Sequence, residues 1–213
     1  MSPSPIAPAS VATPRRKENA QTACNEVREM RRRVEETGSP LYSRQHREMY
    51  DFPLLHWCRN RRVLEVGVGY GYGIERLAKS AREVVGIDIL KENVAHASEA
   101  RDLPNAAYVL ADIRTWEAEP ESFDVAVMID VIEHISDDRR ALENIRRLLK
   151  PRGTLFVSTV WPRLADDGVP FNRCHCREYF PREFRTLVKS VFPDVILHAY
   201  PERNLIIQAQ KES

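Results

Sequence analysis

The stretch from Val63 to Gly73, VLEVGVGYGYG, decides the fold class of this 213-residue chain. A short apolar run that contains one acid, Glu65, leads directly into a series of glycines. The glycines occupy every second position: Gly67, Gly69, Gly71 and Gly73. Glycine lets the backbone turn sharply and lets a ligand approach the main chain closely. The stretch therefore predicts a buried strand that ends in a tight loop against a ligand.

Downstream, short β-rich runs alternate with helical patterns. We expect strands at 62–66, 83–88, 106–112, 123–130 and 153–159, and helices at 72–81, 91–101, 136–150 and 181–191. Continuous apolar strands separated by helices are typical of a parallel sheet covered on both faces. The last two expected strands, 194–200 and 204–210, are joined too closely for a crossover helix, so this pair should be antiparallel. The pattern predicts an α/β fold.

The region before Arg61 has a different composition. Residues 1–20 are rich in Pro, Ser and Ala, and we predict a disordered tail there. Helical patterns follow at 22–38 and 41–58, the second interrupted near Pro53. The expected organisation is a tail at 1–20, a helical lid at 21–60 and one domain at 61–213.

Composition excludes several classes of function. The formal net charge is +1, which gives no support for bulk binding of nucleic acid or an anionic membrane. Four scattered cysteines are too few for a disulfide framework. No apolar run approaches the roughly 20 residues that span a bilayer, and the N-terminus lacks the apolar segment of a secretory signal. We expect a soluble, cytoplasmic protein without a membrane partner.

The glycine spacing bears on the ligand. A dinucleotide fold would want G-x-G-x-x-G, but Tyr72 stands where the third glycine should be. This favours a ligand with a nucleoside but no phosphate, although a tight turn without any ligand is the alternative. Asp88, at the end of the second expected strand, could accept hydrogen bonds from ribose hydroxyls. Asp112, at the end of the third, could accept one from an adenine amino group. Each acid alone would most often be a solvated loop carboxylate.

Together these motifs resemble those of the class I S-adenosylmethionine-dependent methyltransferases. The segments that carry the resemblance are VLEVGVGYG, VVGIDI, LADI, FDVAVMIDVIEHI and LLKPRGTLFVST. The resemblance implies S-adenosyl-L-methionine as cofactor and a Rossmann-like, seven-stranded, mostly parallel sheet with one antiparallel strand and helices on both faces. The later motifs look like those of the small-molecule and glycan branch. Glu65 replaces the commoner Asp, and Arg152 replaces a Gly of the usual turn; neither change puts cofactor binding in doubt.

The same resemblance implies a set of cofactor-binding residues. They are Arg47, Tyr50, Glu65, Gly67, Val68, Gly69, Gly71, Asp88, Ile89, Asp112, Ile113 and Asp130. Glu65 and the glycines would line the methionine end, Asp88 would hold the ribose, and Asp112 with Ile113 would hold the adenine.

Two members of this set precede the first strand. Arg47 could pair with the methionine carboxylate and Tyr50 could hydrogen-bond it. A solvated Arg47 and a packed Tyr50 are the alternative.

Catalytic groups are expected directly after the fourth strand, in the run DVIEH. Asp130, Glu133 and His134 resemble the acid-x-x-Glu-His cluster of quinone-biosynthesis O-methyltransferases, where such groups bind a divalent metal or assist deprotonation. Histidine is the side chain best suited to take a proton near neutral pH, so we predict His134 as the base and expect no metal. A metal site and a purely structural brace are the alternatives.

The segment FNRCHCREYF, residues 171–180, supplies candidate acceptor contacts. It resembles an HxREY element of glycan-associated members, which points to His175, Arg177 and Tyr179. The alternative is that Arg177 and Tyr179 only dock the loop. Cys174 and Cys176 lack a second ligand pair at the spacing of a zinc site.

The sequence thus predicts a methyltransferase that acts on a small molecule or glycan, on oxygen rather than nitrogen. An RNA or protein methyltransferase is the alternative among enzymes. A catalytically inactive, nucleoside-binding partner subunit is the alternative outside them.

Overall fold

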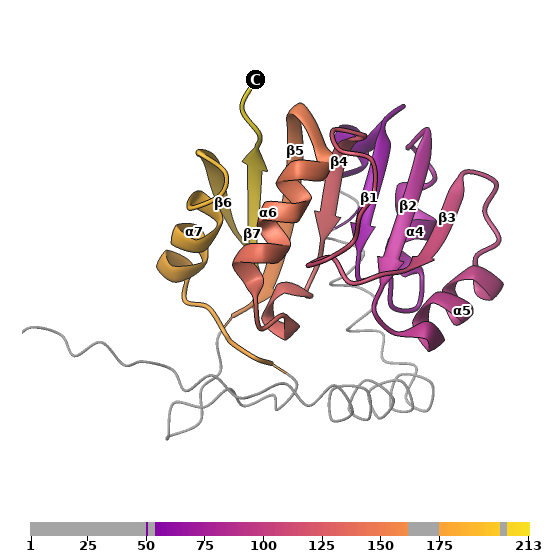
Figure 1. The fold of residues 1–213 in the computed structure, drawn as a ribbon, viewed down its shortest axis with the longest axis horizontal. Helices are drawn as coiled ribbons and strands as arrows, with labels where there is room; N and C mark the ends of the chain where they lie inside the picture. The colour runs from indigo at the N-terminus through magenta and orange to yellow at the C-terminus, as the bar shows by residue number, and fades with distance from the viewer. Residues whose placement is uncertain (1–49, 51–53, 162–174, 201–203) are drawn as a thin grey trace, which may run out of the picture.

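A seven-stranded sheet forms the centre of the molecule (Figure 1). The computed structural model describes residues 50, 54–161, 175–200 and 204–213. The strand order is β3-β2-β1-β4-β5-β7-β6. The strands are β1 (Arg62–Val66), β2 (Glu83–Asp88), β3 (Ala106–Leu110), β4 (Phe123–Met128), β5 (Leu149–Val160), β6 (Asp194–Tyr200) and β7 (Asn204–Gln210).

Strand direction brings the ends of β1, β2 and β4 to one edge of the sheet. Val66 pairs in register with Ile87 of β2 and Met128 of β4, and all three pairings along β3-β2-β1-β4 are parallel. In the described part of the chain, β7 alone runs the other way, antiparallel to both β5 and β6. The predicted fold class is confirmed, including the antiparallel final pair.

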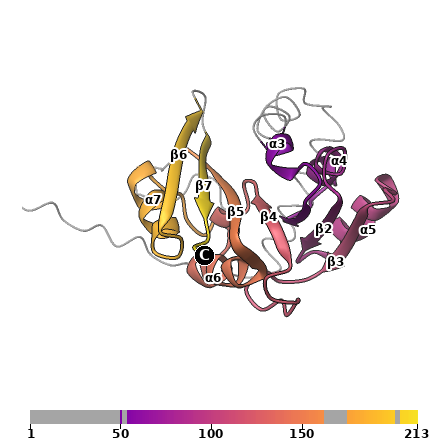
Figure 2. The ribbon, with the colours of Figure 1, turned by 90° about the horizontal axis from the view of Figure 1, so that it is seen from above.

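Helices cover both faces. They are α3 (Leu55–Cys58), α4 (Tyr72–Leu77), α5 (Lys91–Ala100), α6 (Asp138–Leu148) and α7 (Pro181–Lys189), with a short 3₁₀ turn η2 (Ile132–His134). Viewed from above, α3 and α4 lie on one side of the sheet and α6 on the other (Figure 2).

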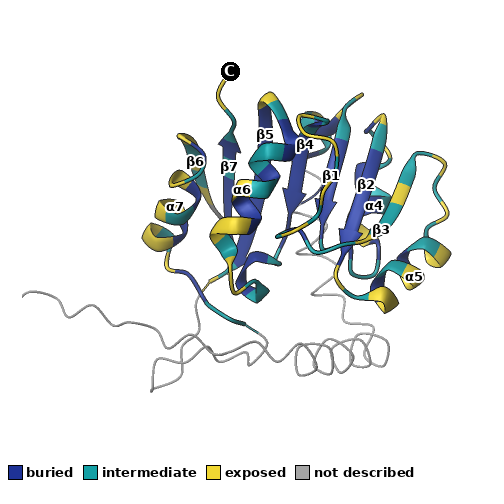
Figure 3. Ribbon diagram, in the orientation of Figure 1, coloured by how far each residue is buried: buried dark blue, intermediate teal, exposed yellow. Residues whose placement is uncertain are grey.

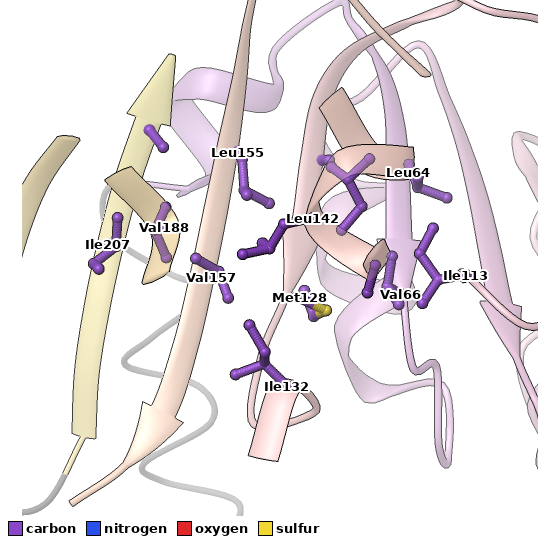
Figure 4. Packing of buried hydrophobic residues seen from close by; sticks show 14 of the residues in the cluster. Leu64, Val66, Ile113, Met128, Ile132, Leu142, Leu155, Val157, Val188 and Ile207 are labelled. Atoms are coloured by element: carbon purple, nitrogen blue, oxygen red, sulfur yellow. The ribbon is translucent and has the colours of Figure 1, made fainter. Parts of the chain in front are cut away.

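Alternation along each strand explains the two layers, since successive side chains point to opposite faces. Leu64 and Val66 join the cluster that includes residues of α6 and α7, whereas Val63 joins the cluster with α3 and α4. Figure 4 shows the first cluster, where Leu142 of α6 packs among side chains of the sheet. The central strands are buried along most of their length, and the outer faces of the helices are exposed (Figure 3).

Several element boundaries differ from expectation, among them the two that flank the predicted catalytic run. Strand β4 ends at Met128 instead of residue 130, because Asp130 adopts a left-handed backbone with φ of 52°, which no extended strand tolerates. Helix α6 begins at Asp138, since Asp137 is its N-cap and accepts a hydrogen bond from the Arg140 N–H. Both shifts lengthen the irregular segment between β4 and α6, where the catalytic residues are predicted.

Several predictions lie outside the described residues: the tail, the first helical pattern, Arg47 and Cys174. The proposed division into tail, lid and domain therefore stays a prediction. Among the described residues, no helix combines the length and apolar character that crossing a bilayer requires.

Candidate cofactor and acceptor site

The loop after β1 turns through three glycines with positive φ. The angles are 80° at Gly67, 49° at Gly69 and 80° at Gly71. A Cβ at Gly67 would lie 2.4 Å from a methyl of Val131, whereas a Cβ at Gly69 would meet no described atom within 4 Å. Gly67 is thus needed for packing against the turn after β4, and the backbone at Gly69 borders open space. The loop has the form that close approach by a ligand requires.

Glu65 lies under this loop, 1% exposed, and accepts a hydrogen bond from the Tyr50 hydroxyl over 2.7 Å. Its other oxygen, Oε2, is buried without a hydrogen-bond partner among the described residues. Burial raises the pKa of Glu65 to about 8, against the lowering effect of the Tyr50 hydrogen bond. The structure therefore brings two of the predicted cofactor residues together and leaves one buried acceptor atom unused.

Asp88 fastens the glycine loop to the end of β2. Its Oδ2 accepts hydrogen bonds from the Gly69 N–H and the Asn93 side-chain amide, each 3.0 Å long. Its Oδ1 accepts one from the Leu90 N–H at 2.9 Å. Asn93 was not among the predicted site residues; the signal for it in the sequence is an amide in the first turn of the helix that follows Asp88.

The predicted adenine residues lie at the end of β3. Arg114 grips the Asp112 carboxylate through its backbone N–H and its guanidinium, the shortest contact being 2.7 Å. Partial burial raises the pKa of Asp112, but the hydrogen bonds from Arg114 leave it below its ordinary value. The Ile113 side chain is buried in the core, whereas Ile89 is exposed beside Asp88.

Asp130 forms hydrogen bonds with residues of two other strands of the sheet. Its N–H donates to the Ser158 hydroxyl, which in turn donates to the Asp130 carboxylate over 2.6 Å. The Asn204 amide donates to both carboxylate oxygens at 3.1 and 3.0 Å. Asp130 therefore joins the end of β4 to β5 and β7.

Glu133 has the opposite environment. It is 1% exposed, and neither carboxylate oxygen has a hydrogen-bond partner of normal geometry among the described residues. The Thr159 hydroxyl and the Val160 N–H face it from the end of β5. Burial raises the pKa of Glu133 well above its ordinary value, and the negative charge of Asp130 raises it further.

The segment after the undescribed residues 162–174 packs on this turn. The N–H groups of Cys176 and Arg177 donate to the Glu133 carbonyl at 2.8 and 3.2 Å, and the Cys176 thiol donates to the His134 carbonyl at 3.2 Å. The rings of His134 and His175 meet edge to face, with centroids 4.9 Å apart. The structure thus brings together the predicted base and one predicted acceptor contact.

The other two predicted acceptor residues fasten the segment to α6. The Tyr179 hydroxyl, in a fully buried side chain, donates to Asp138 over 2.8 Å. The Arg177 guanidinium lies 3.6 Å from the same carboxylate. Burial, followed by the charge of Asp138, raises the pKa of Tyr179.

Glu178 was not singled out by sequence analysis. Its Oε1 lies 2.8 Å from His175 Nδ1, and the two side chains are only 2% and 7% exposed. A carboxylate oxygen accepts and a protonated ring nitrogen donates, so this contact matches the tautomer that carries its proton on Nδ1. The spacing His-x-x-Glu was visible in the sequence, but nothing there marked the pair as buried.

A cation could be held at this point. One ligand atom from each of Glu133, His134 and His175 lies within 4.8 Å of the other two. Asp130, the third member of the sequence motif, does not belong to this group.

Comparison with known proteins agrees with the geometry. Residues 64–157 match the model of a methyltransferase domain. A "Probable S-adenosylmethionine-dependent methyltransferase" of Mycolicibacterium smegmatis is 36% identical over 154 residues, which cover 69% of this chain and 57% of that protein. A ubiquinone biosynthesis O-methyltransferase of Coxiella burnetii is 33% identical over 104 residues, covering 48% of this chain and 44% of that protein.

A solved structure shows the same fold. The S-adenosylmethionine-dependent methyltransferase of Mesorhizobium loti superposes with a TM-score of 0.59 at 17% identity, over 76% of this chain and 97% of the other. The chain spans about half the length of the curated relatives that it matches. Residues 64–157 thus form a methyltransferase domain, and the fold around them is that of the class I methyltransferases that use S-adenosyl-L-methionine.

Proposed function

We propose that this protein transfers the methyl group of S-adenosylmethionine to a hydroxyl of a small-molecule or glycan acceptor. The observation that carries the proposal is the pairing of His134 with His175 after β4, at the strand edge where the glycine loop follows β1. In open α/β sheets, ligands bind outside the carboxyl ends of the strands. A methyl donor held at β1 and β2 would then meet an acceptor beside the histidine pair.

The cofactor half of the site, which comprises the glycine loop with Glu65 and Asp88, supports the proposed orientation of the methyl donor. The unused Oε2 of Glu65 suits the ammonium of the methionine part, and the Asp88 carboxylate suits the ribose hydroxyls. Open space at Gly69 admits the ligand to the backbone. We propose that Tyr50, Val68, Ile89 and Ile113 also line the cofactor site. Asp112 would contact the adenine, and the adenine would compete with Arg114 for the Asp112 carboxylate.

The acceptor half of the site, which comprises Glu133, His134 and His175, supports transfer to oxygen. Methyl transfer mainly needs in-line positioning, and a hydroxyl must also lose its proton. We propose that His134, with Glu133 and His175 beside it, assists this loss. Asp130 would shape the turn through Ser158 and Asn204. Arg177 and Tyr179 would hold His175 in place through Asp138, and His175 would contact the acceptor.

The test supplies the full-length protein with cofactor labelled in its methyl group and three separate acceptor pools: small molecules with glycans, RNA, and protein. Label in the first pool, stable to treatments that cleave carboxyl esters, is the expected result. Label confined to RNA or protein would overturn the acceptor class. Cofactor binding without label in any pool would favour an inactive partner subunit.

A further inference from the structure

We propose that Glu133, His134 and His175 form a binding site for a divalent transition-metal cation. The first support is Glu133 itself. A buried carboxylate without hydrogen bonds is costly, and buried charges in proteins are normally paired or coordinate a metal. Both Glu133 oxygens are buried and lack a normal hydrogen bond within the described residues, at a side chain 1% exposed.

The second support is distance. Metal–nitrogen and metal–oxygen bonds in such sites measure about 2.0–2.2 Å, so two ligand atoms in a tetrahedral arrangement lie about 3.3–3.6 Å apart. The three ligand atoms here already lie within 4.8 Å of one another. Side-chain movements of up to about 1 Å each would bring the three atoms to ligating distance.

The third support is the group behind His175. A metal-bound histidine commonly donates its other ring N–H to a carboxylate, which fixes the tautomer and the ring orientation. His175 Nδ1 donates to the buried Glu178 over 2.8 Å, so Nε2 would be the ligating atom. Glu178 thereby gains a positioning role that the methyl-transfer proposal alone does not give it.

The donor set selects the kind of cation. Two imidazoles with one carboxylate suit Zn²⁺, Co²⁺ or Fe²⁺, whereas Mg²⁺ and Ca²⁺ prefer oxygen ligands throughout. The site differs from the acid-x-x-Glu-His run of the sequence. Asp130 is engaged by Ser158 and Asn204, and the third ligand comes from His175, 41 residues after His134.

The use of the cation rests on the proposed function: a bound cation would polarise the acceptor hydroxyl and favour loss of its proton. His134 would then assist that loss as a ligand of the cation, because a ring nitrogen that binds a cation cannot also take a proton. Binding of the cation does not rest on that function. The test therefore contains neither cofactor nor acceptor, and a failed methyl-transfer assay would leave its result intact.

The experiment titrates the full-length, chelator-treated protein with Co²⁺ and follows both visible ligand-field absorption and binding heat. One equivalent should bind and produce a ligand-field band. Glu178→Gln should weaken binding by about 10–100-fold, as loss of an orienting partner does. Glu133→Gln and His175→Ala, which remove a ligand, should each weaken binding more than Glu178→Gln does. His198→Ala, a change of an exposed histidine on β6, is the matched control and should bind like the parent.

The absence of saturable Co²⁺ binding by the parent would overturn the proposal. So would equal affinity of parent and His175→Ala, or a loss of the same size in His198→Ala. Thermal melting of each variant shows whether it is folded. If one ligand variant does not fold, the other ligand variant decides, and Glu178→Gln gives a third reading of the same site.

Discussion

The loop after β1 and the turn after β4 lie at the same edge of the sheet, yet they treat their buried carboxylates differently. Asp88 accepts three hydrogen bonds, all from residues within 19 positions of it in the chain. Glu133 accepts none of normal geometry among the described residues. The ligand atoms that lie within 4.8 Å of its carboxylate belong to His134 and to His175, which comes from a distant segment of the chain. In the cofactor half, Asp88 is thus satisfied by local contacts. The acceptor half is assembled over long range and retains unused binding capacity.

The comparison assigns chemistry to the acceptor half, and His134→Ala tests that assignment with the largest expected effect. If His134 assists proton loss, its removal should lower kcat by about 10²–10⁴-fold and change cofactor affinity only a few-fold. His134→Gln should not restore the rate, because an amide cannot take a proton. Steady-state kinetics with calorimetry of cofactor binding measure both quantities. A change in kcat below about threefold, with a lower melting temperature, would make His134 a structural brace.

Gly67→Ala and Gly69→Ala test the contact between the loop after β1 and the turn after β4. Alanine at Gly67 combines a strained positive φ with a clash against Val131 of the β4 turn, and should destabilise by about 2–5 kcal/mol. Alanine at Gly69 meets no described atom and should cost only about 1–2 kcal/mol of backbone strain, while weakening cofactor binding. Urea denaturation of both variants measures the difference. Equal losses of stability would show that the contact with Val131 is not what constrains Gly67.

These contacts explain why the sequence predicted the cofactor half more fully than the acceptor half. The apolar strand, the glycine spacing and Asp88 fall within 26 residues, and β-α alternation fixes their relative position. The pairing of His134 with His175 depends on how the segment after β5 returns over η2, which no local pattern encodes. Asp130 shows the same limit: its place in DVIEH suggested catalysis, but Asn204, 74 residues later, and Ser158 of β5 engage its carboxylate.

Substitutions of Asp88 test whether its carboxylate binds the ribose of the cofactor. Asp88→Ala should weaken S-adenosylmethionine binding at least about tenfold, because it removes charge-assisted hydrogen bonds to the ribose. It also releases the Gly69 N–H, so the loop itself should loosen. Asp88→Asn keeps one acceptor oxygen and should lose less. Calorimetry that gives parent, Ala and Asn proteins one affinity would contradict the assignment of Asp88 to the ribose.

The last effect is spread over a range of pH and concerns Glu65, a carboxyl of the cofactor half that resembles Glu133 in being incompletely paired. In the folded protein its pKa is about 8, whereas a carboxyl of this type ordinarily titrates near 4.5. Between these values the folded state holds a proton that the unfolded chain has released, so stability falls as pH rises, by up to about 1.4 kcal/mol per pH unit. Above about pH 8 both states are ionised and this contribution no longer changes.

Glu65→Gln should flatten the dependence of the free energy of unfolding on pH, measured by urea denaturation between pH 5 and pH 8. Glu133, whose pKa is also raised, is present in both proteins, so the difference between the two curves isolates Glu65. Glu99→Gln, an exposed acid on α5, should leave the curve of the parent unchanged. Parallel curves for the parent and Glu65→Gln would mean that Glu65 is already ionised at neutral pH in the folded protein. The Tyr50 hydrogen bond would then outweigh burial, and the cofactor's ammonium would meet a carboxylate without displacing a proton.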